Sequence, residues 1–314
     1  TVQRSLGMKD SVPGKDLQLT IDLGLQQAAE KALSDKKAGA IVALDPRTGA
    51  ILAMASRPTF NPNFFSRTFR SQKEFNYLFF SSQKPLFNRA INAYDPGSTW
   101  KPVTAMAGME TGKFSSEVRL NTTACIKYGA HCFREHNGKG FGLIGYEDAL
   151  RYSSNTFFYQ VGVGVGSEAL YDAAIKLGFN DTTGIELYYE EGIGLVGNKK
   201  WAEEGRGWSE PGSTPWIPED IASAAIGQAV VQVTPLQLAR AYAVFANGGY
   251  LITPHLAKLD IDWTSSKYRT KVDIQPSTLN TIREGLRAVA KSGTGWAITA
   301  NLPDFPPVAG KTGT

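Results

Sequence analysis

The 314-residue chain is poor in cysteine and histidine, with two of the first and three of the second. Two cysteines are too few for a disulfide-rich scaffold, and no apolar run reaches the roughly 18 residues that a membrane-spanning helix requires. A net charge of +4, without basic runs interleaved with aromatic residues, does not indicate nucleic-acid binding. We expect no signal peptide within these residues. We therefore expect a globular piece of a longer chain, whose membrane anchor, if it has one, lies outside these residues.

The two cysteines, Cys125 and Cys132, lie close together in the sequence, with His131 and His136 beside them. Their spacing allows one local disulfide if the compartment is oxidising. The same four residues could suggest a metal site, but their spacing matches no zinc pattern. We therefore expect a disulfide or free thiols here, and we predict no metal site and no cofactor.

Hydrophobic spacing predicts strands near the start of the chain. Residues 17–22 alternate as a strand does, and residues 23–35 carry apolar side chains along one face of a helix. Two apolar runs between residues 38 and 56 flank the turn residues Asp45–Gly49, which indicates a β-hairpin. From residue 57 to 83 the chain is rich in aromatic residues and is predicted to be irregular.

The remainder of the chain is predicted to be mainly helical. Helices are expected at 98–111, on both sides of a polar break at 153–155, within 234–249 and at 277–292, with loops at 190–220 and a short strand at 306–310. This order predicts an α/β fold, mainly an antiparallel sheet flanked by helices, with a large helical subdomain inserted into it. Residues 1–16 are predicted to be a linker and residues 17–314 a single domain.

The pattern Ser-x-x-Lys occurs three times, at residues 34–37, 81–84 and 98–101. Only the third follows a helix-breaking Pro-Gly pair and precedes an apolar helix. That context would bury Lys101 instead of exposing it to solvent. Ser98 is therefore a candidate nucleophile and Lys101 its candidate base, although a helix start with a surface lysine would give the same pattern.

Two further motifs follow Ser98 in order along the chain. Ser153-Ser154-Asn155 lies between two predicted helices, and Lys311-Thr312-Gly313 follows a short apolar run. Each has a simpler structural explanation: a helix cap, a bonded backbone group, or a charge that protects a sheet edge. Together and in this order, however, the three motifs are typical of β-lactamases and penicillin-binding proteins. Lys291-Ser292-Gly293 is a less suitable third motif, because its glycine is better explained as the end of a helix.

With these motifs, nearly the whole chain resembles the transpeptidase domain of class B penicillin-binding proteins. The segments that carry the resemblance include GAIVALDPRTGAILAMAS, SSNTFFYQVG, IGQAVVQVTPLQLARAYAVFANGG and VAGKTGT. The tail TFFYQVG and the tryptophan-containing stretch before IGQ are most similar to the elongation type, penicillin-binding protein 2. The resemblance implies a β-lactamase/transpeptidase-like fold. It also implies that C-terminal strands are missing, because the family continues beyond its third motif.

The resemblance implies a serine acyl-enzyme mechanism. Ser98 would attack the penultimate D-alanine of a peptidoglycan stem peptide, release the terminal D-alanine, and pass the acyl group to an amine on a neighbouring stem. β-Lactams would acylate the same serine. Lys101 would have to be neutral to act as base, whereas a free lysine titrates near ~10.4. Burial and the charge of Lys311 would both lower the pKa of Lys101. Ser153 would relay a proton to the leaving amine.

The same resemblance assigns the remaining site residues. Asn155 would hold Lys101 and the substrate amide, and Lys311 and Thr312 would bind the terminal carboxylate. Gly313 would let the backbone approach the substrate closely. The backbone N–H groups of Ser98 and Thr314 would form the oxyanion hole.

Two features of the sequence add little to the site. Gln228 either lies near the cleft or starts a helix. Some elongation-type relatives carry a metal between the first two motifs, but its ligands cannot be matched here, where Gly138-Lys139-Gly140 replaces Gly-His-Gly.

The resemblance also implies partners and a location. The expected partners are peptidoglycan stem peptides, β-lactam antibiotics and a membrane-embedded glycosyltransferase, with no nucleic acid. The expected location is the outer face of the cytoplasmic membrane, through an N-terminal anchor that this chain lacks. A septal-type transpeptidase, a class D-like β-lactamase, a β-lactam sensor domain and a non-enzymatic scaffold are the alternatives. Rapid turnover of a β-lactam would favour the β-lactamase, and an absence of acylation would favour the scaffold.

Overall fold

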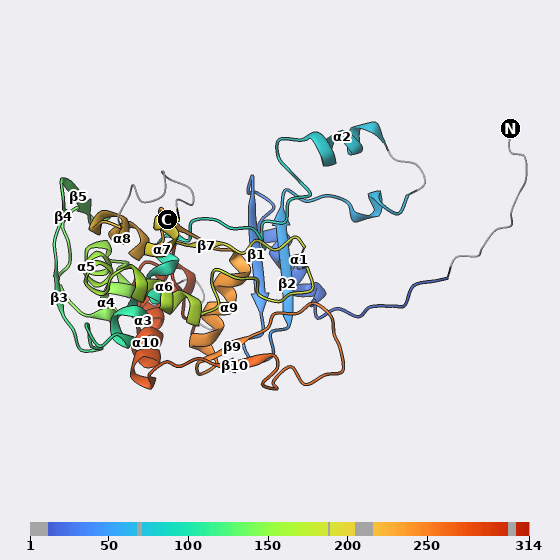
Figure 1. Ribbon diagram of the computed structural model, residues 1–314. Helices are drawn as coiled ribbons and strands as arrows, with labels where there is room; N and C mark the ends of the chain where they lie inside the picture. Colours follow the sequence, from blue (N-terminus) through green and yellow to red (C-terminus); the bar gives the residue numbers. More distant parts are fainter. Residues whose placement is uncertain (1–11, 68–70, 188, 205–215, 301–305, 314) are drawn as a thin grey trace, which may run out of the picture.

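The computed structural model describes residues 12–67, 71–187, 189–204, 216–300 and 306–313 (Figure 1). Its helices are α1 Leu23–Ala32, α2 Gln72–Phe80, α3 Lys101–Glu110, α4 Tyr146–Arg151, α5 Asn155–Val165, α6 Ser167–Lys176, α7 Lys199–Glu203, α8 Pro218–Ala225, α9 Pro235–Ala246, α10 Pro276–Ser292 and α11 Trp296–Ala300, with 3₁₀ turns η1 Pro62–Phe64 and η2 Gly97–Trp100. Its strands are β1 Gly39–Leu44, β2 Ile51–Arg57, β3 Leu120–Thr122, β4 Cys125–Tyr128, β5 His131–Arg134, β6 Gly142–Ile144, β7 Leu195–Val196, β8 Val231–Gln232, β9 Tyr250–Ile252 and β10 Arg269–Lys271.

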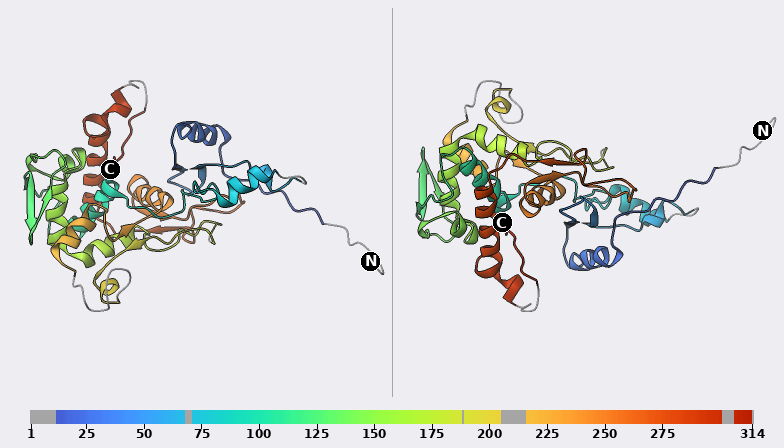
Figure 2. Two further views of the ribbon diagram at one scale, coloured as in Figure 1. Left: turned by 90° about the horizontal axis from the view of Figure 1, so that it is seen from above. Right: turned by 90° about the horizontal axis from the view of Figure 1, so that it is seen from below.

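The described strands pair antiparallel, as β1–β2, β3–β6, β4–β5, β7–β8 and β9–β10. The β1–β2 hairpin with α1 lies toward the N-terminal end, and most helices gather at the other end (Figures 1 and 2). Helix α9 lies between the two groups and packs on β1. The predicted α/β fold with a helical subdomain is confirmed. No helix in the described part of the chain is long and apolar enough to cross a membrane.

Helix α3 is the centre of the helical subdomain. All its residues from Lys101 to Met109 are buried, because α5, α6, α4 and α10 pack around it. After Lys101, the sequence PVTAMAGM is apolar or small on every face, which is typical of a helix with no solvent-exposed side. Lys101 begins this helix, and its side chain is completely buried.

The predicted hairpin at residues 38–56 is confirmed. Strands β1 and β2 pair in register from Gly39–Arg57 to Ala43–Ala53, and the turn closes with a bond from the Gly49 N–H to the Asp45 carbonyl (2.9 Å). Gly49 has a left-handed backbone with φ of +87°, and a Cβ there would collide with the Thr253 carbonyl. Glycine is therefore required at this turn.

Two predicted strands are wrong. Residues 17–22 make one bridge, from Leu19 to Ala257. The segment changes neighbour from Leu256 at Thr20 to Leu52 at Asp22, so no regular ladder forms. Residues 306–313 are not a strand either. The Gly310 N–H donates to the Leu286 carbonyl on α10 (3.0 Å), so the segment bonds to a helix instead of to a strand.

Two predicted irregular regions are partly regular. Within 57–83, α2 is capped by the Ser71 hydroxyl, which accepts from the Glu74 N–H (3.1 Å) and donates to its carboxylate (2.9 Å). This is a Ser-x-x-Glu capping pattern that the sequence contained. Within 190–220, the described residues include β7 and α7. Residues 205–215 lie outside the described part.

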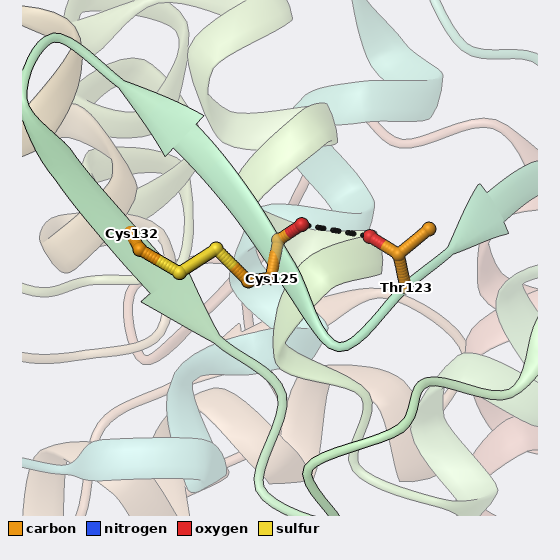
Figure 3. Close-up of a disulfide and its surroundings, with 3 residues drawn as sticks. All are labelled: Thr123, Cys125 and Cys132. Carbon is orange, nitrogen blue, oxygen red and sulfur yellow. Dashed lines mark hydrogen bonds between the residues drawn. A yellow bond between two sulfur atoms is a disulfide. The ribbon is translucent and has the colours of Figure 1, made fainter.

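Cys125 and Cys132 form a disulfide, one of the two expected states. It joins β4 to β5 (Figure 3). The Thr123 hydroxyl donates to the Cys125 carbonyl at the start of β4 (2.8 Å). The hairpin is therefore fixed at its base, and it leads directly to residue 135, which contacts the site described below.

We predict that Gly285→Ala destabilises the protein, although alanine is the better helix former by about 1 kcal/mol. A Cβ at Gly285 would overlap the Leu150 side chain where α10 packs on α4. Overpacking of this kind costs about 1–3 kcal/mol. Asn280→Ala, at an exposed position of α10, is the control and should leave stability equal or slightly higher. The test is the urea midpoint at unchanged slope. A Gly285→Ala midpoint at or above wild type would show that the helices can move apart without cost.

Candidate active site

Ser98 lies in η2, the 3₁₀ turn that leads into α3. The sequence predicted an α-helix from Ser98, but Pro102 has no N–H, and the turn closes from the Lys101 N–H to the Ser98 carbonyl. Gly97 has φ of +53°, and its N–H donates to the Gly227 carbonyl (2.9 Å). Ser98 is buried at the edge of this turn.

The Lys101 amine is completely buried and points to the α4–α5 turn. It donates to the Ser153 carbonyl (2.6 Å), to Ser153 Oγ (3.2 Å) and to Asn155 Oδ1 (2.7 Å). These three bonds use all three donors of an ammonium group. The Ser98 hydroxyl makes no hydrogen bond with the described residues, so the predicted contact between Ser98 and Lys101 is not formed here. Catalytic hydrogen bonds often tighten only when substrate is bound.

Ser153 and Asn155 lie where α4 ends and α5 begins. Ser153 has a left-handed backbone with φ of +57°, which is uncommon for a residue with a side chain. This turn directs both its carbonyl and its hydroxyl toward Lys101. Ser154 caps α5 by accepting from the Phe157 N–H (3.3 Å). The polar break that the sequence predicted is therefore the place where α3 and α5 exchange polar contacts.

The Lys311 segment reaches the same point from the other side. Lys311 Nζ donates to Ser153 Oγ (2.8 Å) and to the Thr312 carbonyl (3.1 Å). Gly313 lies against η2, where a Cβ would approach Thr99 Cγ2 to 3.2 Å. Thr314 lies outside the described residues. The structure thus brings Lys101, Ser153, Asn155 and Lys311 into one network, with Ser98 on the adjoining turn.

The two lysines in this network have lowered pKa values. Burial holds the pKa of Lys101 well below its usual range; the charge of Lys311 lowers it further, and Glu135 opposes both. Burial lowers the pKa of Lys311 to about 8. A lysine that can lose its proton near neutral pH can act as a base, and one that keeps it can bind an anion.

Three other sequence predictions can be placed. Gln228 is exposed and follows the end of α8, so the helix start, one of its two expected roles, is wrong. Gly293 follows the last residue of α10, as predicted for residues 291–293. However, the next residue, Thr294, bonds to the Thr312 hydroxyl (2.7 Å), so this segment also borders the site. The described residues contain no group of three or more His, Cys, Asp or Glu side chains arranged to hold a metal ion.

Sequence reasoning missed two supports of the site. Gly227, in the IGQ segment, has φ of +75°, and a Cβ there would collide with the Gly97 carbonyl and with Trp100 Cβ. Glu135 is a buried carboxylate bonded to the start of α5. The glycine could have been suspected from its place in IGQ. The glutamate stands in the polar stretch CFREHNGKG, which looks solvent-exposed, and nothing in that stretch marks it.

A serine on a helix turn, with a buried lysine on one side of a Ser-x-Asn turn and a partly buried lysine on the other, is the arrangement of active-serine, penicillin-recognising proteins. The comparison with known families agrees. The chain belongs to the penicillin binding protein transpeptidase domain family, which matches residues 39–314.

Three individual relatives show which members of the family this chain is similar to. The peptidoglycan D,D-transpeptidase MrdA of Acinetobacter baumannii is 35% identical over 100% of this chain and 46% of its own length. A crystal structure of PBP2 from Pseudomonas aeruginosa in complex with WCK 5153 superposes with a TM-score of 0.86 at 33% identity, over 96% of this chain and 68% of that one. A structure described as a peptidoglycan synthase complex that coordinates polymerization and crosslinking gives 0.84 at 34%, over 98% and 54%. The chain spans about half the length of the curated relatives it matches.

We predict that Gly227→Ala slows the reaction of the site with a fluorescent penicillin. The added methyl would displace η2 and Ser98, and a shift near 1 Å can cost on the order of 100-fold in rate. Gly112→Ala is the matched control. It also lies at positive φ, at the far end of α3, but a Cβ there meets nothing within 4 Å. The measurement is the labelling rate per folded molecule. Equal rates for the two variants would show that η2 does not depend on the contact with Gly227.

Proposed function

We propose that this domain is a peptidoglycan D,D-transpeptidase that cross-links stem peptides through an acyl-enzyme on Ser98, and that β-lactams acylate the same serine. The observation that carries the proposal is that Lys101 and Lys311 both donate to Ser153 Oγ. Three motifs far apart in the sequence thus meet at one atom, beside the turn that presents Ser98. Membership of the transpeptidase family supports the same reaction.

In the proposed acylation, neutral Lys101 takes the proton of Ser98 directly or through Ser153. Ser98 Oγ then forms a bond to the carbonyl carbon of the penultimate D-alanine. The bond from this carbon to the nitrogen of the terminal D-alanine breaks, and the proton passes through Ser153 to that nitrogen. D-Alanine leaves as an amine, and an ester remains on Ser98.

In the proposed second step, the amine of a neighbouring stem attacks the ester. A new amide bond forms, the bond to Ser98 Oγ breaks, and the proton lost by the attacking amine returns to the serine through Lys101. The charge of Lys311 and the Thr312 hydroxyl would bind the substrate carboxylate. The N–H groups of Ser98 and Thr314 would stabilise the oxyanion in both steps.

We further propose an elongation-type role at the outer face of the cytoplasmic membrane, beside a membrane-embedded glycosyltransferase. The similarity to MrdA and PBP2 proteins and to a subunit of a peptidoglycan synthase complex supports this role. The Cys125–Cys132 disulfide supports the location, because disulfides persist in oxidising compartments such as the periplasm.

We predict that incubation with a penicillin adds the mass of the drug once to the wild-type protein and not to Ser98→Ala. Ser81→Ala and Ser34→Ala are matched controls, because each removes the serine of another Ser-x-x-Lys pattern, and both should still form the adduct. The measurement is intact-protein mass against time.

Other results would change the assignment. A short-lived adduct with continuous consumption of the drug would favour a β-lactamase. An adduct that survives in Ser98→Ala would place the nucleophile elsewhere. A folded, full-length protein that forms no adduct would contradict an acyl-enzyme mechanism altogether.

We predict a bell-shaped pH dependence for the acylation rate constant. Lys101 must be uncharged to accept a proton, so the rate rises with pH through its lowered pKa. Lys311 loses the charge that binds the carboxylate as the pH passes about 8, so the rate falls there. Lys311→Arg keeps its charge and should move the falling limb to higher pH. A falling limb at the same pH in Lys311→Arg would show that another group titrates.

A further inference from the structure

We propose that Glu135 is a positioning residue of this site, whose buried carboxylate holds the α4–α5 turn in the conformation that Lys101 contacts. The proposal rests on the proposed function. Glu135 follows β5 directly and does not belong to any of the three motifs. It makes no hydrogen bond with Lys101, so its effect would pass through the backbone and side chains of residues 154–156 and through its charge.

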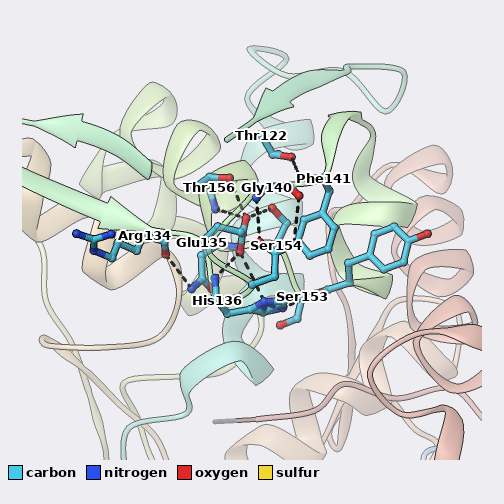
Figure 4. Close-up of polar contacts among 12 residues, drawn as sticks. Thr122, Arg134, Glu135, His136, Gly140, Phe141, Ser153, Ser154 and Thr156 are labelled. Carbon is cyan, nitrogen blue, oxygen red and sulfur yellow. Dashed lines mark hydrogen bonds and ion pairs between the residues drawn. The ribbon is translucent and has the colours of Figure 1, made fainter. Parts of the chain in front are cut away.

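The Glu135 carboxylate accepts five hydrogen bonds from the start of α5 and from its own neighbour, and Figure 4 shows the carboxylate beside Ser154 and Thr156. One oxygen accepts from the Asn155 N–H (2.7 Å) and the His136 N–H (3.0 Å). The other accepts from Ser154 Oγ (2.6 Å), the Thr156 N–H (3.0 Å) and Thr156 Oγ1 (2.8 Å). Each oxygen is thus surrounded by donors, and an amide side chain could not accept all five.

The position of Glu135 explains why it is ionised although it is only 3% exposed. Asn155 and Thr156 are the first residues of α5, and their N–H groups have no partner inside the helix. The positive end of the helix dipole also favours an anion there. Burial raises the pKa of Glu135, but the bonds from Ser154, Asn155 and Thr156 outweigh it and hold the pKa below its usual range.

The Glu135 carboxylate acts on the residues that accept hydrogen bonds from Lys101. Ser153 has the left-handed backbone that aims its carbonyl at Lys101, and Asn155 supplies the third acceptor. The chain is tied down on both sides of Ser153: His136 Nε2 bonds to the Tyr152 carbonyl (2.8 Å), and Glu135 binds the backbone of residues 155 and 156 and the hydroxyl of 154. Without the carboxylate, the turn would lose its fixed end, and the direction of both acceptors would no longer be set.

The β4–β5 hairpin, which Glu135 directly follows, fixes the position of the carboxylate. The Glu135 N–H donates to the Ala124 carbonyl (2.9 Å), which pairs the two ends of the β4–β5 hairpin, and the disulfide joins the same strands. Phe141 then stacks on Tyr152, with ring centroids 5.0 Å apart and planes 10° apart. The segment after β5 therefore contacts the α4–α5 turn at several points, with the carboxylate as its charged contact.

The test compares Glu135→Gln with wild type by the second-order rate of acylation with a fluorescent penicillin, per titrated active site. We expect a fall of about tenfold or more, because the acceptors of Lys101 are displaced. The negative charge of Glu135 raises the pKa of Lys101, so its removal should lower that pKa. We therefore also expect the rising, acid limb of the pH profile to move to lower pH. A purely structural role would reduce the number of active sites but change neither the rate per site nor the limb.

The charged groups near this network are included in the design. Among the described residues, Lys311 and Glu135 act on Lys101, and His136 and Tyr159 face Glu135. Burial, followed by the charge of Glu135, raises the pKa of Tyr159 to about 12, outside the range used. Because His136 Nδ1 lies 4.0 Å from a Glu135 carboxylate oxygen, both profiles are repeated in a His136→Gln background.

Three further variants complete the test. Glu135→Asp keeps the charge and should recover part of the rate and the original limb. Thr156→Val removes one of the five donors to the Glu135 carboxylate and should reduce the acylation rate by a smaller factor. This variant keeps the test usable if Glu135→Gln folds poorly. Glu191→Gln is the matched control: Glu191 is also buried and accepts from the Thr183 N–H (3.0 Å), but has no bond to the α4–α5 turn. Its rate per site should equal wild type.

The outcomes separate the two proposals. If the wild-type protein forms no adduct on Ser98, the proposed function fails first. If the wild-type protein is acylated, and Glu135→Gln and Thr156→Val match its rate and limb, the positioning role is wrong and the proposed function stands. If Glu135→Asp behaves as Glu135→Gln does, the length of the side chain matters more than its charge, and the role of the anion is overturned.

Discussion

The structure depends on the burial of one amine. Lys101 is completely enclosed, and a buried ammonium without partners costs far more than a small domain can tolerate. Three acceptors from the α4–α5 turn surround it. Two of them belong to Ser153, whose left-handed backbone turns its carbonyl and its hydroxyl toward the lysine, and the third is Asn155 Oδ1. The helical subdomain packs around α3 in the way that keeps this turn against the lysine.

A second lysine makes the network asymmetric. Lys311 donates to the same Ser153 hydroxyl as Lys101, so two cations would share one small polar group if both were charged. Repulsion of this kind favours loss of a proton from one of them. Lys101 is the more deeply buried of the two and is also repelled by Lys311, so it is the better candidate to become neutral. Lys311, nearer to solvent, keeps its charge to a higher pH and suits an anionic ligand.

Local patterns were enough to predict the hairpin at Asp45–Gly49 and the buried helix after Ser98. The prediction failed where a partner elsewhere in the chain decides the structure. Residues 17–22 alternate like a strand, but no continuous neighbour pairs with them, and residues 306–310 approach a helix instead of a sheet. The role of Glu135 was missed for the same reason: its partners lie elsewhere in the chain. Its stretch looks like a polar surface loop, and only the folded chain shows that five donors converge on it.

Glycines explain how segments so far apart can meet at the Ser98 turn. Gly97 donates to the carbonyl of Gly227, and a Cβ on Gly227 would occupy the space of the turn itself. Gly313 closes on the same turn from the other side, beside Thr99. A larger residue at Gly227 would separate two backbones that lie in contact at the Ser98 turn, and one at Gly313 would press on the Thr99 side chain. The site is therefore specified by residues without side chains as much as by the polar groups, and substitutions at those glycines act on the chemistry through distance.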